Sequence, residues 1–291
     1  MMGHLSTTLS RVKRSSLIYE EFSSLHEMAS TIKTRPYNAT FVGREISSES
    51  NDSSFTRTRT YAEAEELMLS GWTEPLGRIE DAVKKSEKDF EEFHAKRVMP
   101  KNSYVGVVPN VPRAMYGLPD SMIRYERERE AARTVHILYN ISASGSIGQE
   151  ELLKSGIAVL SAINLIEKLG VRVRLDLIEI ALSGNDIAGW GLMLKDYRNP
   201  IDLKKICFPI SHPSMLRRIA FRWMETVPDI PRAFYGGYGT PYYRANENDE
   251  YMDLTRVEKP YSYLSVSYIR DIGYDVAELY RYITGKAVKN S

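Results

Sequence analysis

Cysteine is almost absent from this sequence, which has Cys207 alone among 291 residues. A single cysteine excludes an internal disulfide framework and fits a reducing compartment. Because Cys207 lies in the apolar run 206–210, we interpret it as a small buried hydrophobic residue. Histidine is also scarce, with five residues, and no His-x-x-x-His or Cys-x-x-Cys spacing is present. The sequence therefore predicts no zinc site.

Long apolar runs are absent as well. No segment approaches the roughly 20 apolar residues that a helix needs to cross a bilayer, so we expect no membrane partner. Net charge is also nearly absent, with 39 lysines and arginines against 38 acidic residues. That balance gives no support for bulk electrostatic attraction to nucleic acid, and a protein partner is favoured.

Composition divides the chain into three parts. Residues 1–57 are polar and include the serine-rich run 47–54, so we expect a flexible polar arm. Residues 58–130 are expected to form a helical segment and a proline-rich connector, with helices over 61–69 and 76–96. Residues 131–291 are expected to form one α/β domain.

Strands and helices are expected to alternate within 131–291. The expected strands are 135–139, 171–182, 189–196, 205–210 and 261–269. The expected helices are 149–168, one that begins after Ser211, and 271–284. The second strand alternates apolar with charged residues, which indicates a half-exposed strand, and the third returns as an edge hairpin. This order predicts an α/β fold with a largely parallel sheet flanked by helices.

A polar loop follows the first expected strand and reads Asn140-x-Ser142-x-Ser144. Strand, loop, helix and strand together resemble the opening of a von Willebrand factor A-like domain, a Rossmann-like fold. In that family the loop usually reads Asp-x-Ser-x-Ser and coordinates a divalent metal, and here asparagine stands in the first position. The resemblance implies that Asn140, Ser142 and Ser144 occupy the metal positions, for Mg²⁺ or Mn²⁺. The family also uses a threonine and an aspartate from later loops.

Three interpretations of this loop stay open. In the first it binds the metal, with Asp186, Asp196 and Thr240 as candidates for the later ligands. In the second the loop has degenerated and only caps the following helix. In the third the backbone N–H groups at the helix start hold an anion such as phosphate. No Gly-Lys-Ser/Thr follows, so a nucleotide P-loop is excluded.

An internal echo is the second notable feature. The sequence Val-Pro-Asn-Val-Pro-Arg-Ala-Met-Tyr-Gly at 108–117 recurs as Val-Pro-Asp-Ile-Pro-Arg-Ala-Phe-Tyr-Gly at 227–236. Each copy has an arginine and a tyrosine, residue types that anchor interfaces. We expect Arg113, Tyr116, Arg232 and Tyr235 to bind a partner. The copies form either a paired clamp around one groove or two similar loops that brace the sheet edge.

The remaining candidates for chemistry are few. His212 has Ser211 and Ser214 beside it, and we favour a helix-capping cluster over a general base with its nucleophile. Arg217, Arg218 and Arg222 are expected to form a solvated basic face. No catalytic residue is assigned, and the chain is expected not to be an enzyme.

The resemblance sets the expected function. Von Willebrand A-like domains mostly work as non-catalytic binding modules and as partners of AAA+ ATPases. In overall texture the chain also resembles uncharacterised proteins encoded by tailed phages. We therefore expect a protein-interaction module, located in the cytoplasm or in the host cytoplasm if phage-encoded, with an AAA+ ATPase or a homo-oligomer as partner. The alternatives are an enzyme acting on a phosphorylated or nucleic-acid substrate at the Asn140 loop, and a virion or assembly component.

Overall fold

The fold is taken from a computed structural model of the chain. The structure describes residues 5–6, 16–38, 46–87, 98–127, 134–242, 257 and 259–288. Two regions are distinguished below. Residues 98–127 are named the β-extension, and the other described residues are named the body.

A seven-stranded sheet organises the body, in the order β1-β2-β8-β7-β6-β10, with β9 paired to the end of β7. The strands are β1 (Leu5–Ser6), β2 (Leu17–Phe22), β6 (Thr134–Asn140), β7 (Arg172–Ser183), β8 (Asp186–Lys195), β9 (Thr240–Pro241) and β10 (Ser262–Ser265). The pairs β6–β7, β6–β10 and β2–β8 are parallel, and β7–β8 is an antiparallel hairpin. The predicted α/β class with a largely parallel sheet flanked by helices is therefore confirmed.

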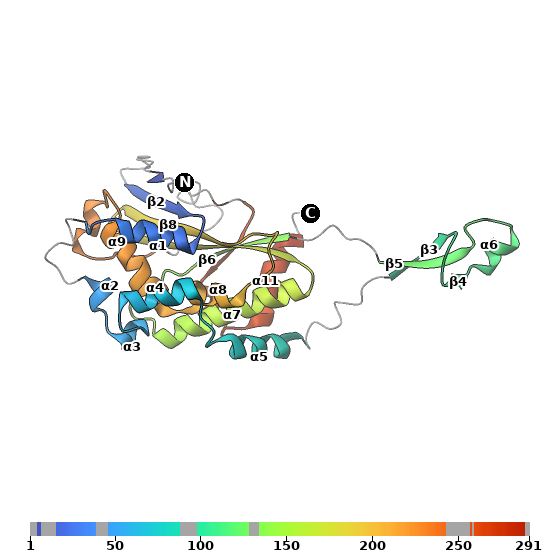
Figure 1. The fold of residues 1–291 in the computed structure, drawn as a ribbon, viewed down its shortest axis with the longest axis horizontal. Helices are drawn as coiled ribbons and strands as arrows, with labels where there is room; N and C mark the ends of the chain where they lie inside the picture. Colours follow the sequence, from blue (N-terminus) through green and yellow to red (C-terminus); the bar gives the residue numbers. More distant parts are fainter. Residues whose placement is uncertain are drawn as a thin grey trace.

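Helices cover one face of this sheet (Figure 1). They are α1 (Leu25–Thr34), α4 (Tyr61–Ser70), α5 (Leu76–Glu87), α7 (Gln149–Lys168), α8 (Leu203–Ser211), the π-helix η2 (Met215–Ala220), α9 (Phe221–Thr226), α10 (Val266–Asp271) and α11 (Val276–Val288). Helix α7 is central because most of its surface is apolar, and it packs against α5, α8 and α11. Isoleucines and leucines of β6 and β7 alternate between this core and a smaller cluster on the other face.

The flexible polar arm predicted over 1–57 is wrong for the residues that the structure describes. Strand β2 pairs along its full length with β8, and it buries Leu17, Ile18 and Phe22. The short helices α2 (Ser47–Ser50) and α3 (Ser53–Thr56) then lie against η2. The predicted boundary at residue 131 is also wrong, because β2 belongs to the same sheet. Residues 1–4, 7–15 and 39–45 of the predicted arm lie outside the described residues.

Four predicted elements differ in the structure, and one is the strand expected over 261–269, whose second half forms helix α10 instead. Residues 205–210 were expected to be a strand and lie instead in helix α8, whose first turn is capped by the Asp202 side chain at the Lys205 N–H. Strand β7 is mostly buried rather than half-exposed, and β8 is not an edge because β2 lies beyond it. Short apolar runs such as 205–210 are compatible with either a strand or a buried helix, so periodicity alone could not decide.

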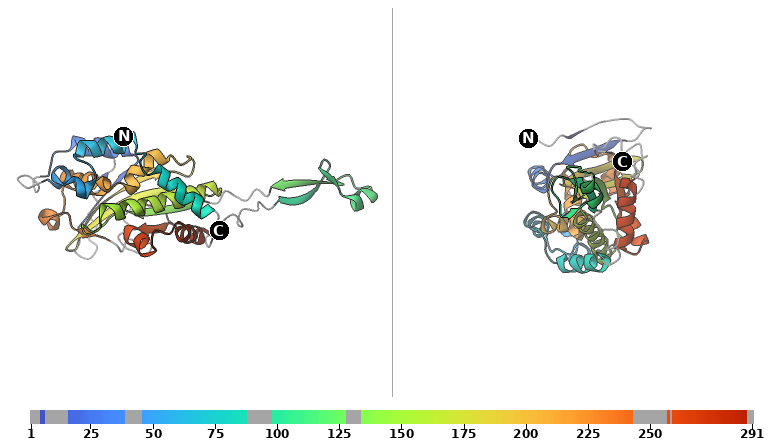
Figure 2. Two further views of the ribbon diagram at one scale, coloured as in Figure 1. Left: turned by 90° about the horizontal axis from the view of Figure 1, so that it is seen from below. Right: turned by 90° about the vertical axis from the view of Figure 1, so that its right-hand side faces the viewer.

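The β-extension takes the place of the expected proline-rich connector. It contains β3 (Val98–Ser103), β4 (Val108–Pro109), helix α6 (Val111–Met115) and β5 (Met122–Arg127), with strand order β3-β5-β4. Figures 1 and 2 show it projecting away from the sheet and the helices. Helices α4 and α5 of the expected helical segment are confirmed, and residues 88–96 of the second predicted helix lie outside the described residues.

Among the described residues, no helix is both long enough and apolar enough to cross a membrane.

Candidate functional site

Asn140 ends β6 and is buried at the edge of the sheet where the metal loop was predicted. Its side-chain oxygen accepts a hydrogen bond from the Ser142 N–H at 2.8 Å. Its amide nitrogen donates to the Tyr242 carbonyl oxygen at 3.1 Å and to the Tyr263 hydroxyl at 2.9 Å. An ionised carboxylate has no hydrogen to donate, so aspartate could not bond to the Tyr242 carbonyl oxygen, and the Tyr263 hydroxyl would have to donate to it instead. The asparagine thus joins the ends of β6 and β10 to the chain after β9.

Ser142 is also engaged inside the sheet. Its hydroxyl donates to the Ile180 carbonyl oxygen at 3.0 Å and accepts from the Ile180 N–H at 2.8 Å. It therefore extends the hydrogen bonding of β7 beyond the point where β6 ends. A buried hydroxyl held in this way contributes about 1 kcal/mol to stability, and its oxygen is not directed to an open site.

The contacts of Ser144 and of the start of helix α7 argue against both the anion-binding and the helix-capping interpretations of the loop. The Ser144 hydroxyl accepts from the Ser146 N–H at 3.3 Å. The Gly148 N–H, at the N-cap of α7, donates to the Glu151 carboxylate at 2.9 Å. The helix is thus capped by Glu151 and not by the loop, so the capping prediction is wrong. The Glu151 carboxylate also places a negative charge where phosphate would have to bind.

The three candidates for later metal ligands do not converge on the loop. Asp186 accepts a hydrogen bond from the Ser16 N–H at 2.8 Å, and the Thr240 hydroxyl donates to the Leu182 carbonyl oxygen at 3.2 Å. Asp196 follows Lys195, at the opposite end of β8 from Asp186. Within the described residues there is also no group of three or more His, Cys, Asp or Glu side chains able to hold a metal ion. The residues at this loop therefore do not fit a divalent metal.

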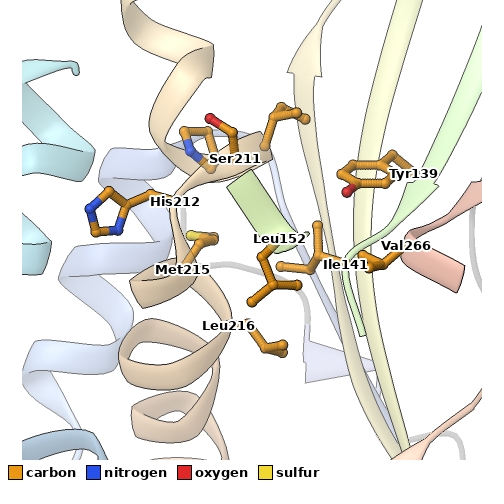
Figure 3. Close-up of a pocket in the computed structure, with 10 residues that line it drawn as sticks. Tyr139, Ile141, Leu152, Ser211, His212, Met215, Leu216 and Val266 are labelled. Carbon is orange, nitrogen blue, oxygen red and sulfur yellow. The ribbon is translucent and has the colours of Figure 1, made fainter. Parts of the chain in front are cut away.

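His212 lies beside a small cavity between η2 and the sheet. The cavity measures about 10 Å³ and is lined by Tyr139, Ile141, Leu152, Pro209, Ile210, Ser211, His212, Met215, Leu216 and Val266 (Figure 3). A volume of this size holds at most one water molecule, not a substrate. Figure 3 shows the imidazole turned away from Tyr139 and Ile141.

The surroundings of His212 make it a poor general base. Its ring stacks on Phe208 with centroids 4.7 Å apart, and its Nδ1 accepts from the Ser214 N–H at 3.1 Å. Burial, with a smaller effect from the Arg57 charge, lowers the pKa of His212 to about 3. The Ser211 hydroxyl donates to the Cys207 carbonyl oxygen at 2.6 Å. This cluster holds helices together, and a base so weak would be protonated too rarely to serve catalysis near neutral pH.

The solvated basic face predicted for Arg217, Arg218 and Arg222 is wrong. Arg217 and Arg218 are fully buried, and Arg222 is only half-exposed. The Arg218 guanidinium donates to the carbonyl oxygens of Ser48, Glu49, Asn51 and Thr58 and to the Thr58 hydroxyl. A guanidinium has five N–H donors, so these bonds satisfy it and bind residues 48–58 to η2. Sequence periodicity could not reveal this because the cations are covered by a segment distant in the chain.

Sequence reasoning also missed two groups of buried ionisable residues. His136 Nε2 lies 2.5 Å from Asp176 Oδ2, which also accepts from Arg174 at 2.9 Å. These side chains bridge β6 and β7 on the face away from α7. On the other face Glu179 is buried, its Oε2 has no hydrogen-bond partner among the described residues, and burial raises its pKa to about 8. The His136 group lies away from the Asn140 loop, whereas Glu179 lies on β7 between Ile178 and Ile180, whose backbone atoms Ile141 and Ser142 of the loop bind.

The body copy of the echo, 227–236, braces the end of the sheet. Val227, Ile230 and Phe234 are buried in the main core. The Ala233 carbonyl oxygen accepts a hydrogen bond from the Ser183 hydroxyl at 2.7 Å, at the tip of the β7–β8 hairpin. Arg232 and Tyr235 lie on the outside of this copy.

The other copy, 108–117, lies in the β-extension and not beside the first. Arg113 pairs with Asp120 at 2.7 Å within the β-extension, and Tyr116 is exposed. The clamp around one groove is therefore wrong, since the structure does not bring Arg113 and Tyr116 to Arg232 and Tyr235. The bracing interpretation holds for the second copy alone.

Exposed hydrophobic side chains are concentrated on the β-extension. Among the described residues, eleven large hydrophobic residues are exposed, and nine of them lie between 104 and 125. They are Tyr104, Val105, Val107, Val108, Val111, Met115, Tyr116, Leu118 and Tyr125. Scattered exposed hydrophobics are normal, whereas their concentration in one small region is typical of an interaction site. This surface is the strongest candidate site of the described residues, and the exposed valines and methionine on it were not predicted.

Comparison with known proteins gives one family. The family model for a domain of unknown function, DUF7192, matches residues 10–278. Neither the curated proteins nor the solved structures contain a match.

Proposed function

This chain belongs to the DUF7192 family, a domain of unknown function, and we propose from its own residues that it is a non-enzymatic protein-interaction module. The partner binds the β-extension. The observation that carries the proposal is that nine of the eleven large hydrophobic residues exposed in the described part of the chain lie there. Burying one such side chain yields about 1.5–3 kcal/mol, so a covering protein would gain substantially from this surface. Tyrosine and methionine, both exposed here, are residue types enriched at interfaces.

We propose further that the body is von Willebrand A-like, with a degenerate metal loop. In support, β6 and β7 are parallel, β8 returns antiparallel, and a polar loop joins β6 to α7. The resemblance implies a binding module and allows an AAA+ ATPase as its partner. The alternative of an enzyme at the loop has less support, because Asn140 and Ser142 already use their polar atoms to tie strands together.

Photo-cross-linking in cells of the natural source tests the interaction. The photoreactive amino acid p-benzoyl-phenylalanine would replace Tyr116, which is 85% exposed on the β-extension. The matched control places it at Met193, a residue of β8 that is 36% exposed. We expect a discrete protein adduct from position 116 and none from position 193. Absence of any adduct at 116, or an adduct that nuclease digests, would overturn the proposed function.

A further inference from the structure

We propose that the partner has an apolar socket of the kind that holds 227–236 in the body, and that the β-extension enters this socket through Val108, Val111 and Met115. The inference rests on the proposed function and names the chemistry of its partner. The body copy of the echo serves as an internal example of how this motif packs against protein.

The two copies have the same anchors in opposite surroundings. In the body, Val227, Ile230 and Phe234 are 0%, 3% and 0% exposed. The matching residues of the β-extension, Val108, Val111 and Met115, are 42%, 58% and 82% exposed. Side chains of the same class at the same spacing are thus covered in one copy and open in the other. The open copy therefore has the apolar anchors of the packed motif without the residues that cover them.

The open copy is folded, with a helical turn at the same place as in the body copy. Helix α6 has Pro112 in its first turn, and the Asn110 side chain accepts from the Arg113 N–H at its start. The body copy forms a short 3₁₀ helix, η3 (Arg232–Gly236), directly after Pro231. Both copies contain a helical turn at this place, but the backbone before it differs, since Asp229 is left-handed (φ +57°) and the matching Asn110 is not (φ −85°). Docking in the manner of the body copy therefore requires residues 108–111 to change conformation.

The body also shows what surrounds the anchors. Besides apolar core, two donors reach carbonyl oxygens of the motif: the Asn38 amide donates to Val227 at 3.0 Å and the Ser183 hydroxyl donates to Ala233 at 2.7 Å. The matching carbonyls in the β-extension belong to Val108 and Ala114. The partner's socket therefore has apolar walls and side-chain donors at these two places.

The occupant is a protein other than a second copy of this chain. In a second copy the described socket is filled by its own residues 227–236, which are tethered in place and would have to be expelled. A nucleic acid is disfavoured because the anchors are two valines and a methionine, and the packed copy holds them in a hydrophobic core.

Variants of the anchors test the inference on the full chain with the photoreactive residue at position 116. The double variant Val111→Ile, Met115→Phe installs two anchors of the body copy, and we expect its adduct yield to stay within about twofold of the parent. Val111→Ser with Met115→Ser removes apolar anchors, and we expect at least about a tenfold loss of the same adduct. Val105→Ser is the comparison variant, an exposed valine of the same surface outside the motif, and we expect it to lower the yield by no more than about twofold.

Specific outcomes separate this inference from the proposed function. If Val105→Ser lowers the adduct as much as the double serine variant does, or if the isoleucine and phenylalanine anchors abolish it, the socket is wrong while the interaction stands. An adduct with twice the mass of the chain would show a second copy and overturn the inference alone. Failure to form any adduct in any background would overturn the proposed function itself.

Discussion

The body and the β-extension differ in how far they bury similar side chains. In the body even cations are covered, and the buried Arg217 and Arg218 are satisfied by backbone carbonyl oxygens. In the β-extension valines, a methionine and tyrosines lie in water. The ten-residue echo, present in both regions, excludes a purely local explanation. What differs is the structure around each copy: core helices and a β-hairpin in one case, a three-stranded ribbon in the other.

This difference indicates which apolar side chains can still contribute free energy of burial when another molecule binds. Each exposed aliphatic side chain of the β-extension forgoes about 1.5–3 kcal/mol that burial would contribute. The body obtains this stabilisation within the chain, and the β-extension obtains it only when another molecule covers it. Three predictions test this contrast.

The largest effect is expected from truncating the same anchor in the two copies. Phe234→Ala removes a fully buried ring and should lower the free energy of unfolding by about 3–5 kcal/mol. Met115→Ala truncates a side chain that is largely in water and should change it by less than about 0.5 kcal/mol. Urea denaturation followed by tryptophan fluorescence measures both, since Trp190 and Trp223 are in the body core. Equal losses from the two variants would show that Met115 is packed against the body in solution.

A smaller effect concerns pH and the body alone. Burial raises the pKa of Glu179 to about 8, well above its value in the unfolded chain. Between about pH 4.5 and pH 8 the folded state therefore keeps a proton that the unfolded state has lost. Stability should fall as pH rises through this window, by about 1.4 kcal/mol per pH unit.

Glu179→Gln should remove that pH dependence, because glutamine has no proton to lose. The measurement is urea denaturation at several pH values between 5 and 8, with Glu63→Gln on the exposed face of α4 as the control. A wild-type chain whose stability is flat or rising across this window would mean that Glu179 is ionised in the folded state.

The sequence predicted the centre of the fold better than its periphery. Strand β6, helix α7 and the β7–β8 hairpin have strong periodic patterns, because each is long or bounded by glycine or polar turns. Strand β2 was missed because Glu20 is a charged residue in the middle of it. In the structure Glu20 is buried and bound by Arg35, fifteen residues later, and by Trp223, which is distant in the chain. Long-range partners of this kind leave no local signal.

The candidate site was predicted only in part, for a related reason. Tyr116 and Arg113 were identified from the echo, and Tyr116 lies in the exposed set. Burial is a property of neighbours, however, so two nearly identical motifs could not be assigned opposite exposures from their residues. The same limit applied to Asn140, whose partners Tyr242 and Tyr263 come from a later part of the chain.

The smallest expected effect on the free energy of unfolding comes from the substitution Gly106→Ala. The same substitution should strongly disturb the β-extension. The chain crosses β5 at this residue, and a Cβ placed there would lie 2.3 Å from the Ile123 carbonyl oxygen. Gly106→Ala must therefore open the crossing and weaken the hydrogen bond from the Val107 N–H to Ile123, which is 2.9 Å in the structure. Because the strands of the β-extension pair with one another, the free energy of unfolding of the body should change by less than about 0.5 kcal/mol.

Hydrogen exchange resolves the two regions in one experiment. In Gly106→Ala, exchange at the Val107 and Asn110 amides should become faster, while amides of α7 keep their protection. Gly117→Asn is the matched control, since Gly117 has a φ of +66° with open space around it and asparagine tolerates that conformation. If Gly106→Ala also speeds exchange in α7, the β-extension is part of the cooperative body and its exposed surface is not an independent docking element. If exchange becomes faster only in the β-extension, Gly106→Ala leaves the body folded and disorders the docking motif. This variant should then fail to form the adduct from position 116.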